Sequence, residues 1–289
     1  MKHGIYVHTH GQLADVEKLS DLAVVAARTG WDGFFIWDQL HHDELPVVDT
    51  QIALGAIALA TRGTDLKIGA LITPLARRRA WKVAKELATL DQLAPNRVVG
   101  GAGIGDSTDF SIASTEPQTG KGRAAALEDG LDILRALLAG GTSWQGARDG
   151  SPSVDTGSPF LPVPENPIPI WGSAVVDRNA GEKQPKKPFR RAAAEMDGLF
   201  PIVIDEDFAP ELCLTPDELA QAIEWAQAGT GEPLPGGFDV IVSGRTQMEA
   251  SPVDLKGLEE AGLTWWLESM PLGITPEEAN AAIEEGPPA

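Results

Sequence analysis

Short apolar runs alternate with amphipathic stretches along the chain, and this alternation predicts strands and helices in turn. Residues 66–73 form an apolar run without polar alternation, which is typical of a parallel strand covered on both faces. A helical stretch follows with Val83, Leu87 and Leu90 on one face, and a Pro-Asn pair ends it before a strand that begins at residues 97–99. Strand, helix and strand in this order predict a βαβ unit and a parallel sheet.

The same alternation continues in both directions. Strands are predicted at residues 3–8, 33–37, 66–73, from 97, 168–172, 197–201, 238–242 and 263–267, and helices at 15–28, 49–61, around 83–94, 123–139, 189–195, 215–228, 255–261 and from 275. Residues 106–121 are polar and predict a loop, and residues 140–167 predict an excursion outside the repeat. Eight strands alternating with helices predict a (β/α)8 barrel of the TIM type, with residues 1–289 forming a single domain.

Composition and charge narrow the class of partner. The 23 basic and 42 acidic residues give a net charge of −19, which argues against nucleic acid and against an anionic membrane surface. The longest mostly apolar run, residues 52–60, is too short to span a bilayer. A single cysteine, Cys213, excludes an internal disulfide, and a start without an apolar signal segment favours a cytoplasmic protein.

In such a barrel the active site lies at the carboxyl ends of the strands. The residues predicted there are His8, Thr9, His10, Asp38, Gln39, Thr73, Gly103, Gly105, Trp171, Gly172, Ser173, Pro201, Ser243, Gly244 and Glu268. A His-x-His pair after the first strand resembles the metal-binding signature of amidohydrolase barrels. All five histidines precede residue 43, so the later ligands of that family are missing, and we predict no metal site.

Glycines and basic residues supply two further signals, each with two interpretations. Glycines at positions 100, 101, 103 and 105 either form part of a dinucleotide fingerprint or let a flat ligand or a loop approach the strand ends closely. The cluster formed by Lys186, Lys187, Arg190 and Arg191 is either a solvated charge run or a phosphate clamp at a helix start, with Ser173 and Arg178 nearby in sequence. Arg77, Arg78 and Arg79 give the same kind of signal after the third predicted strand, and here we favour a role in anchoring their loop over anion binding.

Several blocks of the chain together resemble the bacterial luciferase-like monooxygenase family, and they occur in the family's order. They are residues 30–38, 73–86, 90–91, 97–105, 190–193, 197–201 and 261–268. The resemblance implies a flavin-dependent oxidoreductase or monooxygenase that binds reduced FMN or the deazaflavin F420 at the carboxyl mouth of the barrel. Such enzymes oxidise small organic substrates with O₂ or pass hydride to or from F420.

The resemblance also implies positions for the site. It suggests a non-prolyl cis peptide near Leu71-Ile72, beneath the cofactor ring. The resulting hypothesis assigns His8, Asp38, Gln39 and His41 to catalysis. It assigns Trp37, Leu71, Ile72, Thr73, Gly103, Gly105, Trp171, Gly172, Ser173, Arg178, Arg190 and Arg191 to cofactor binding. A homodimer is expected from the resemblance, and a flavin reductase is a candidate partner.

One residue departs from the family pattern. Many members carry an acid/base histidine after the carboxylate that ends the second strand, whereas this chain has Asp38-Gln39. An amide cannot exchange a proton at neutral pH, so His8, His10, His41 or His42 would have to supply it. The alternatives are a non-catalytic flavin-binding barrel and, less favoured, a metal-dependent hydrolase.

Overall fold

The computed structural model describes residues 1–289 except positions 43, 114, 147–149, 206–212, 247–252 and 289. Its barrel strands are β1 (Lys2–Val7), β2 (Gly33–Ile36), β3 (Lys67–Pro74), β4 (Val98–Gly103), β7 (Ile170–Asp177), β8 (Gly198–Ile204), β9 (Asp239–Gly244) and β10 (Trp265–Ser269). They close in the order β1-β10-β9-β8-β7-β4-β3-β2, and every pairing is parallel. The predicted (β/α)8 barrel is therefore confirmed.

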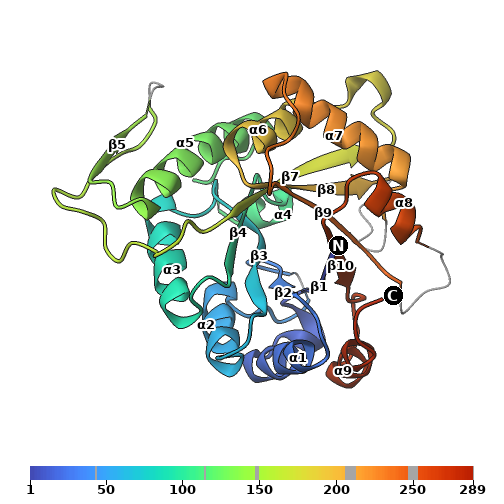
Figure 1. Cartoon of the computed structure of the whole chain (residues 1–289). Coiled ribbons are helices and arrows are strands. Elements are labelled where there is room, and N and C mark those ends of the chain that lie inside the picture. Colours follow the sequence, from blue (N-terminus) through green and yellow to red (C-terminus); the bar gives the residue numbers. More distant parts are fainter. Residues whose placement is uncertain (43, 114, 147–149, 206–212, 247–252, 289) are drawn as a thin grey trace.

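The helices form a ring around these strands (Figure 1). They are α1 (Val16–Arg28), α2 (Thr50–Ala60), α3 (Ala80–Leu93), α4 (Ser107–Ser111), α5 (Gly120–Leu138), α6 (Lys187–Glu195), α7 (Pro216–Thr230), α8 (Leu255–Glu260) and α9 (Pro276–Glu284), with short 3-10 turns η1 (Gly11–Leu13) and η2 (Gly181–Lys183). The excursion carries an antiparallel hairpin of β5 (Ser143–Gln145) and β6 (Ser153–Asp155), which projects from the ring. None of the helices in the described part of the chain is long and apolar enough to cross a membrane.

Local sequence explains where several helices begin. The Asp15 carboxylate accepts hydrogen bonds from the backbone N–H groups of Glu17 and Lys18 and so caps α1. Thr215 and Thr275 each form a capping box at the start of α7 and α9, followed by proline in the first turn. The helix starts predicted at these two threonines are confirmed.

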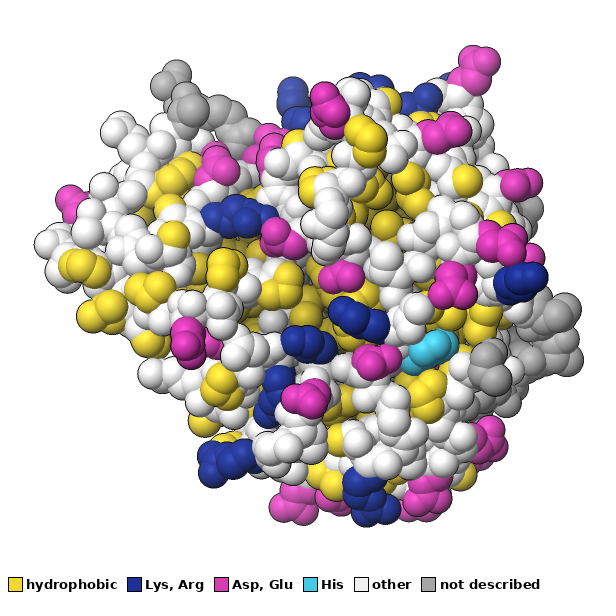
Figure 2. All heavy atoms as spheres, viewed as in Figure 1, with side chains coloured by type: hydrophobic (Ala, Val, Ile, Leu, Met, Phe, Trp, Pro, Cys, Tyr) yellow, Lys and Arg dark blue, Asp and Glu magenta, His cyan; other side chains and the backbone are white. Residues whose placement is uncertain are grey.

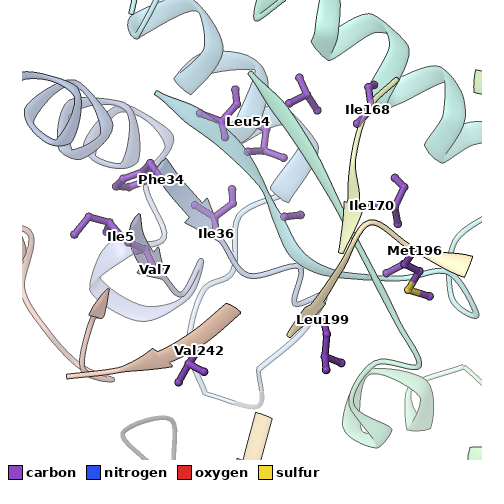
Figure 3. Packing of buried hydrophobic residues seen from close by; sticks show 14 of the residues in the cluster. Ile5, Val7, Phe34, Ile36, Leu54, Ile168, Ile170, Met196, Leu199 and Val242 are labelled. Carbon is purple, nitrogen blue, oxygen red and sulfur yellow. The ribbon is translucent and has the colours of Figure 1, made fainter. Parts of the chain in front are cut away.

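Two layers of apolar side chains hold the barrel together. Along β1, Ile5 and Val7 face outward into the layer between strands and helices, while Tyr6 packs against the cluster that fills the barrel. Figure 3 shows Ile5, Val7, Phe34 and Ile36 in the outer layer. The inner cluster consists of Phe35, Leu71, Val99, Trp171, Phe200, Ile241, Trp265 and Leu267, all at most 2% exposed. The barrel is thus a packed core that opens only at its ends.

Three sequence predictions need correction. Strand β8 continues to Ile204, so Pro201, which was predicted at its carboxyl end, lies within the strand. The segment 106–121, predicted as a loop, contains the short helix α4, because Asp106 accepts a hydrogen bond from the Thr108 N–H and Phe110 is completely buried. Strand β7 continues five residues beyond its predicted end at Gly172, because β8 is equally extended and pairs with it as far as Asp177 and Ile204. Residues 171 and 172 therefore do not lie at the carboxyl end of that strand.

Candidate active site

Aromatic side chains lead from the barrel interior to its carboxyl end. The ring centroid of Tyr6 lies 5.7 Å from that of Phe200 and 5.8 Å from that of Trp37, which follows the last residue of β2. The Tyr6 hydroxyl donates a hydrogen bond of 2.7 Å to the carbonyl oxygen of Leu71. Burial raises the pKa of this phenol, so it remains a hydrogen-bond donor at any physiological pH.

Three histidines stack at the end of this aromatic group. The ring centroids of His8 and His10 are 4.4 Å apart, and those of His10 and His42 are 5.1 Å apart. Trp37 lies 5.8 Å from His10. Burial, together with the neighbouring His8 and His42, lowers the pKa of His10 to about 4, so this imidazole is neutral at pH 7.

Both nitrogens of His8 face backbone carbonyls. Nδ1 lies 3.1 Å from the oxygen of His10 and Nε2 lies 3.0 Å from the oxygen of Pro271. Burial lowers the pKa of His8 against the effect of these two contacts, and the charge of Arg245 lowers it further. A neutral imidazole carries a single N–H, so His8 donates to one of these two carbonyl oxygens and packs its other nitrogen against the second.

Polar atoms without a partner are concentrated at this point of the mouth. Gln39 donates through Nε2 to the carbonyl oxygen of His41 at 3.1 Å. Its Oε1, together with Nδ1 of His10 and Nδ1 of His42, is buried and makes no hydrogen bond to the described residues. Because leaving buried polar groups unsatisfied is costly, these atoms are suited to bind a ligand or water.

A further part of the mouth is built from β3, β4 and β7, which follow β2 around the barrel. The peptide bond between Leu71 and Ile72 is cis, as the resemblance predicts. A Cβ at Gly103 would lie 1.9 Å from Cδ1 of Ile72 and 2.4 Å from Oγ of Ser173, so these three residues are in close contact. A larger residue at position 103 would have to displace the ends of both side chains.

Asp38 occupies an ion cluster rather than the open mouth. Its side chain is 1% exposed, and its carboxylate lies 3.1 Å from Nη2 of Arg77 and 2.9 Å from Nε of Arg78. Arg77 also donates to the Asp38 carbonyl oxygen at 2.9 Å and lies 3.5 Å from Asp109. We expected Asp38 to line the pocket as a catalytic residue, but two arginines hold its carboxylate, and it anchors the loop after β3 to the end of β2.

The arginines predicted to bind phosphate are engaged elsewhere or lie outside the barrel. Arg178 forms a two-point contact with Glu218, with distances of 2.8 and 3.0 Å. Arg191 is 6% exposed and lies 3.2 Å from the Glu128 carboxylate, which also pairs with Lys187 at 2.6 Å. Arg190 packs against Gly229 between α6 and α7. A phosphate clamp at these residues would first have to break existing ion pairs.

Other predicted residues lie below or beside the mouth. Trp171 fills the barrel and donates through Nε1 to Asp239 at the amino end of β9, at 3.1 Å. A Cβ at Gly172 would meet Met196 and Ala192, so this glycine faces helix α6. Gly105 adopts a left-handed φ of +70° in the turn after β4. Thr73 is buried in β3, and His41 is exposed.

Two residues at the mouth were not found by sequence reasoning. Tyr6 is the inward-facing residue of β1, and the alternation of Ile5, Tyr6 and Val7 was the available signal. Arg245 is 7% exposed, follows the last residue of β9 and acts on His8 through its charge. We predicted the strand end two residues earlier, which left Arg245 out of the candidates.

The residues present fit a planar cofactor with hydrogen-bonding edges. Ile72 and Gly103 offer an uncharged surface, Trp37 and His10 offer rings, and His10 and Gln39 also offer buried polar atoms that make no hydrogen bond to the described residues. Among the described residues, no group of three or more His, Cys, Asp or Glu side chains is placed to share a metal ion.

The closed parallel barrel, with polar and aromatic residues at the carboxyl ends of its strands, places this chain in the class of (β/α)8 barrel proteins. Within that class, the chain belongs to the luciferase-like monooxygenase family, whose model matches residues 1–246. This stretch contains seven of the eight barrel strands that are described, and all of the mouth residues named above except Pro271.

Similar sequences are found among F420-dependent glucose-6-phosphate dehydrogenases. That of Nakamurella multipartita is 30% identical over 161 residues, covering 53% of this chain and 45% of the relative. That of Nocardia farcinica is 28% identical over 174 residues, covering 57% and 50%. The matches thus span about half the length of these relatives.

Similar solved structures share the fold over nearly the whole chain. An F420-dependent secondary alcohol dehydrogenase in complex with an F420-acetone adduct has a TM-score of 0.76 at 16% identity, covering 98% of this chain and 96% of the other. The F420-dependent tetrahydromethanopterin reductase of Methanopyrus kandleri has a TM-score of 0.67 at 17% identity, covering 98% and 97%. The FMN complex of the oxygenating constituent of 3,6-diketocamphane monooxygenase from Pseudomonas putida has a TM-score of 0.58 at 16% identity, covering 83% and 66%.

Proposed function

We propose that this chain is an F420-dependent oxidoreductase that passes a hydride between the cofactor and a small organic alcohol or carbonyl compound at the barrel mouth. The observation that carries the proposal is the similarity in sequence to dehydrogenases that are named as F420-dependent. FMN with O₂ is the second candidate, supported by the family's description as monooxygenases and by the FMN-containing structure of similar fold. A flavin reductase enters only as a partner of that second candidate.

The chain would contribute orientation and proton handling, while the bound cofactor supplies or accepts the hydride. His10 presents a buried ring nitrogen without a partner among the described residues and would bind the substrate hydroxyl there, while the second N–H of Gln39 Nε2 would donate to the substrate oxygen. His10 would accept a hydrogen bond from the hydroxyl at an imidazole nitrogen and take up its proton as the hydride leaves, and with a pKa lowered to about 4 it would pass this proton on readily. His8 is less suited to this step because both of its nitrogens face carbonyls, and the Gln39 amide cannot exchange a proton.

The substrate we propose lacks a phosphate group. Arg178 and Arg191 are paired with Glu218 and Glu128, and Arg77 and Arg78 are both held by Asp38. The cofactor itself carries a phosphate that needs positive charge, so a phosphorylated substrate would need a further cation beside it in a chain with a net charge of −19. We therefore expect uncharged secondary alcohols to be better substrates than sugar phosphates.

A homodimer is also proposed, and helix α2 supports it. The eleven residues of α2 include no charged side chain, and Ile52 and Leu59 are 69% and 50% exposed on it. A Cβ at Gly55, between them on the same face, would meet no atom within 4 Å. Such a stripe on an outer helix is suited to pack against its own copy about a two-fold axis.

Spectroscopic titration tests the choice of cofactor. We expect F420 to bind with a change in its absorbance and fluorescence, and FMN to bind more weakly. Stronger binding of FMN, with no response to F420, would favour the monooxygenase candidate. Binding without turnover of any alcohol, ketone or O₂ would instead support a non-catalytic cofactor-binding barrel, which the glutamine at position 39 makes a real alternative.

A further inference from the structure

The segment that follows β2 carries much of the candidate site without regular secondary structure of its own. It provides Trp37, Gln39 and His42, and it runs from the end of β2 to the bridge that His10 forms with Val47. Its start is fixed at the Trp37 carbonyl oxygen, which accepts a hydrogen bond of 2.9 Å from the Thr50 hydroxyl. The remainder needs another anchor to keep its side chains in place.

That anchor is a carboxylate from a different part of the chain. Asp109, on the short helix α4, is 4% exposed. Its Oδ1 accepts hydrogen bonds of 3.2 Å from the backbone N–H groups of both Leu40 and His41, and its Oδ2 lies 3.1 Å from the N–H of Leu40. These two amides directly follow Gln39 and directly precede His42, so Asp109 holds the backbone between the two side chains.

Arg77 makes this arrangement electrostatically possible. Its Nη2 lies 3.1 Å from the Asp38 carboxylate and 3.5 Å from the Asp109 carboxylate. Arg78 pairs with Asp38 on the other side and with Glu86 at 3.6 Å. Without a cation between them, two buried carboxylates so close together would repel each other.

We propose that Asp109 is a positioning residue of the active site, which sets the backbone of residues 39–42 and thereby the placement of Gln39 and His42 at the mouth. The proposal rests on the proposed function for its effect on ligand binding, but its structural part stands on the contacts of Asp109 alone. It assigns a role to a residue of the stretch 106–121, which the sequence predicted only as a loop.

Two substitutions at position 109 separate positioning from simple ion pairing. In Asp109→Asn the amide oxygen at the Oδ1 position still accepts from Leu40 and His41, while the Oδ2 contact with Leu40 and the ion pair with Arg77 are lost. In Asp109→Ala all of these interactions are lost. We expect Asp109→Ala to weaken cofactor binding by about tenfold, equivalent to about 1.4 kcal/mol, and Asp109→Asn to remain close to the wild type. Both should lower the melting temperature, Asp109→Ala more than Asp109→Asn.

A matched control comes from Asp15, whose carboxylate also accepts from two backbone N–H groups, at 2.9 and 3.2 Å, but at the start of α1. Asp15→Ala should lower the melting temperature without changing cofactor affinity. Equal losses of affinity in Asp109→Asn and Asp109→Ala would overturn the proposal, because the ion pair alone would then explain the effect.

Amide hydrogen exchange tests the anchor independently of any cofactor. The amides of Leu40 and His41 should exchange slowly in the wild-type protein and faster in Asp109→Ala, with Asp109→Asn in between. Fast exchange of these amides in the wild-type protein would overturn the proposal even if Asp109→Ala does not fold. If the wild type binds neither F420 nor FMN while the exchange results are as expected, the proposed function fails and the anchor remains.

Discussion

His10 combines burial with a ring nitrogen that has no hydrogen-bond partner among the described residues. Both properties bear on the chemistry, because a neutral imidazole with an available nitrogen can bind or accept a proton. We expect His10→Gln to reduce turnover strongly while leaving cofactor affinity within a few-fold of the wild type. Steady-state kinetics and a cofactor titration on the same preparation would measure the two quantities, and unchanged turnover would remove His10 from the mechanism.

The same substitution should change how stability depends on pH. The pKa of His10 is lowered to about 4 in the folded state, below the ordinary value of 6.5, so the unfolded chain binds a proton more readily. The folded state is therefore favoured by this residue above pH 6.5, and that contribution is lost as the pH falls toward 4. Between pH 7 and 4.5 the wild type should lose roughly 2 kcal/mol more than His10→Gln. Urea unfolding at both pH values measures this difference, and identical losses would contradict it.

Arg191 illustrates a residue whose sequence context suggested a ligand and whose surroundings suggest a structural role. Because its guanidinium is buried against Glu128, Arg191→Ala should lower the free energy of unfolding by about 1.5–3 kcal/mol, a range typical of hydrogen bonds to charged groups. The neighbouring Arg190→Ala serves as control and should change stability little. Neither should alter the ratio of FMN to riboflavin affinity. If Arg191→Ala lost affinity for FMN but not for riboflavin, the interpretation of this cluster as a phosphate clamp would be supported again.

At the scale of the element, the two faces of strand β4 contact different parts of the protein, the mouth on one side and the outer apolar layer on the other. A Cβ at Gly103 would collide with Ile72 and Ser173 at the mouth, whereas one at Gly100 would meet Ile170 and Leu87 in the outer layer. Gly103→Ala should therefore reduce cofactor affinity, and Gly100→Ala should lower stability by about 1–3 kcal/mol without that effect. Cofactor titration and thermal unfolding of both variants test this. Equal effects on affinity would mean that β4 tolerates no change on either face.

The elements themselves were largely predictable from sequence, because period and capping are local properties. Apolar runs located the barrel strands, and Thr215 and Thr275 located two helix starts. The end of β7 was not predictable, since Trp171 and Gly172 carry no stop signal and the strand is prolonged by its pairing with β8. Helix α4 was missed because its five residues are too few to show a period.

The site was less predictable, because it depends on which charges meet in space. Asp38 and Arg77 are far apart in sequence, and nothing in either segment shows that the two side chains form an ion pair. The same holds for Arg178 with Glu218 and for Arg191 with Glu128. Sequence patterns located the carboxyl ends of the strands, but they could not distinguish a charge available to a ligand from one already paired.

At the scale of the whole molecule, acidic side chains are spread over the face shown in Figure 2 with fewer basic ones between them. A net charge of −19 makes two copies repel each other unless they meet at an uncharged surface. The exposed apolar face of α2, formed by Ile52, Gly55 and Leu59, is such an uncharged surface. The single domain and the cytoplasmic location remain predictions of the sequence.

We expect the wild-type protein to sediment at twice its chain mass of 30.6 kDa and Ile52→Glu to sediment as the monomer. The substitution places a charge in the middle of the proposed interface, where it would be desolvated without a partner. Analytical ultracentrifugation measures both. A dimer that persists in Ile52→Glu would place the interface elsewhere, and a monomeric wild type would contradict the homodimer.

The most direct test of the central claim is hydride transfer at the barrel mouth. Purified protein is mixed with oxidised F420 and a series of uncharged secondary alcohols, with glucose 6-phosphate as the phosphorylated comparison, and loss of F420 fluorescence is followed. The account predicts reduction of F420 by at least one uncharged alcohol, little or none by glucose 6-phosphate, and a strongly reduced rate in His10→Gln. The account would be contradicted if none of these alcohols reduced bound F420 and the protein instead oxidised a substrate with O₂ when supplied with reduced FMN.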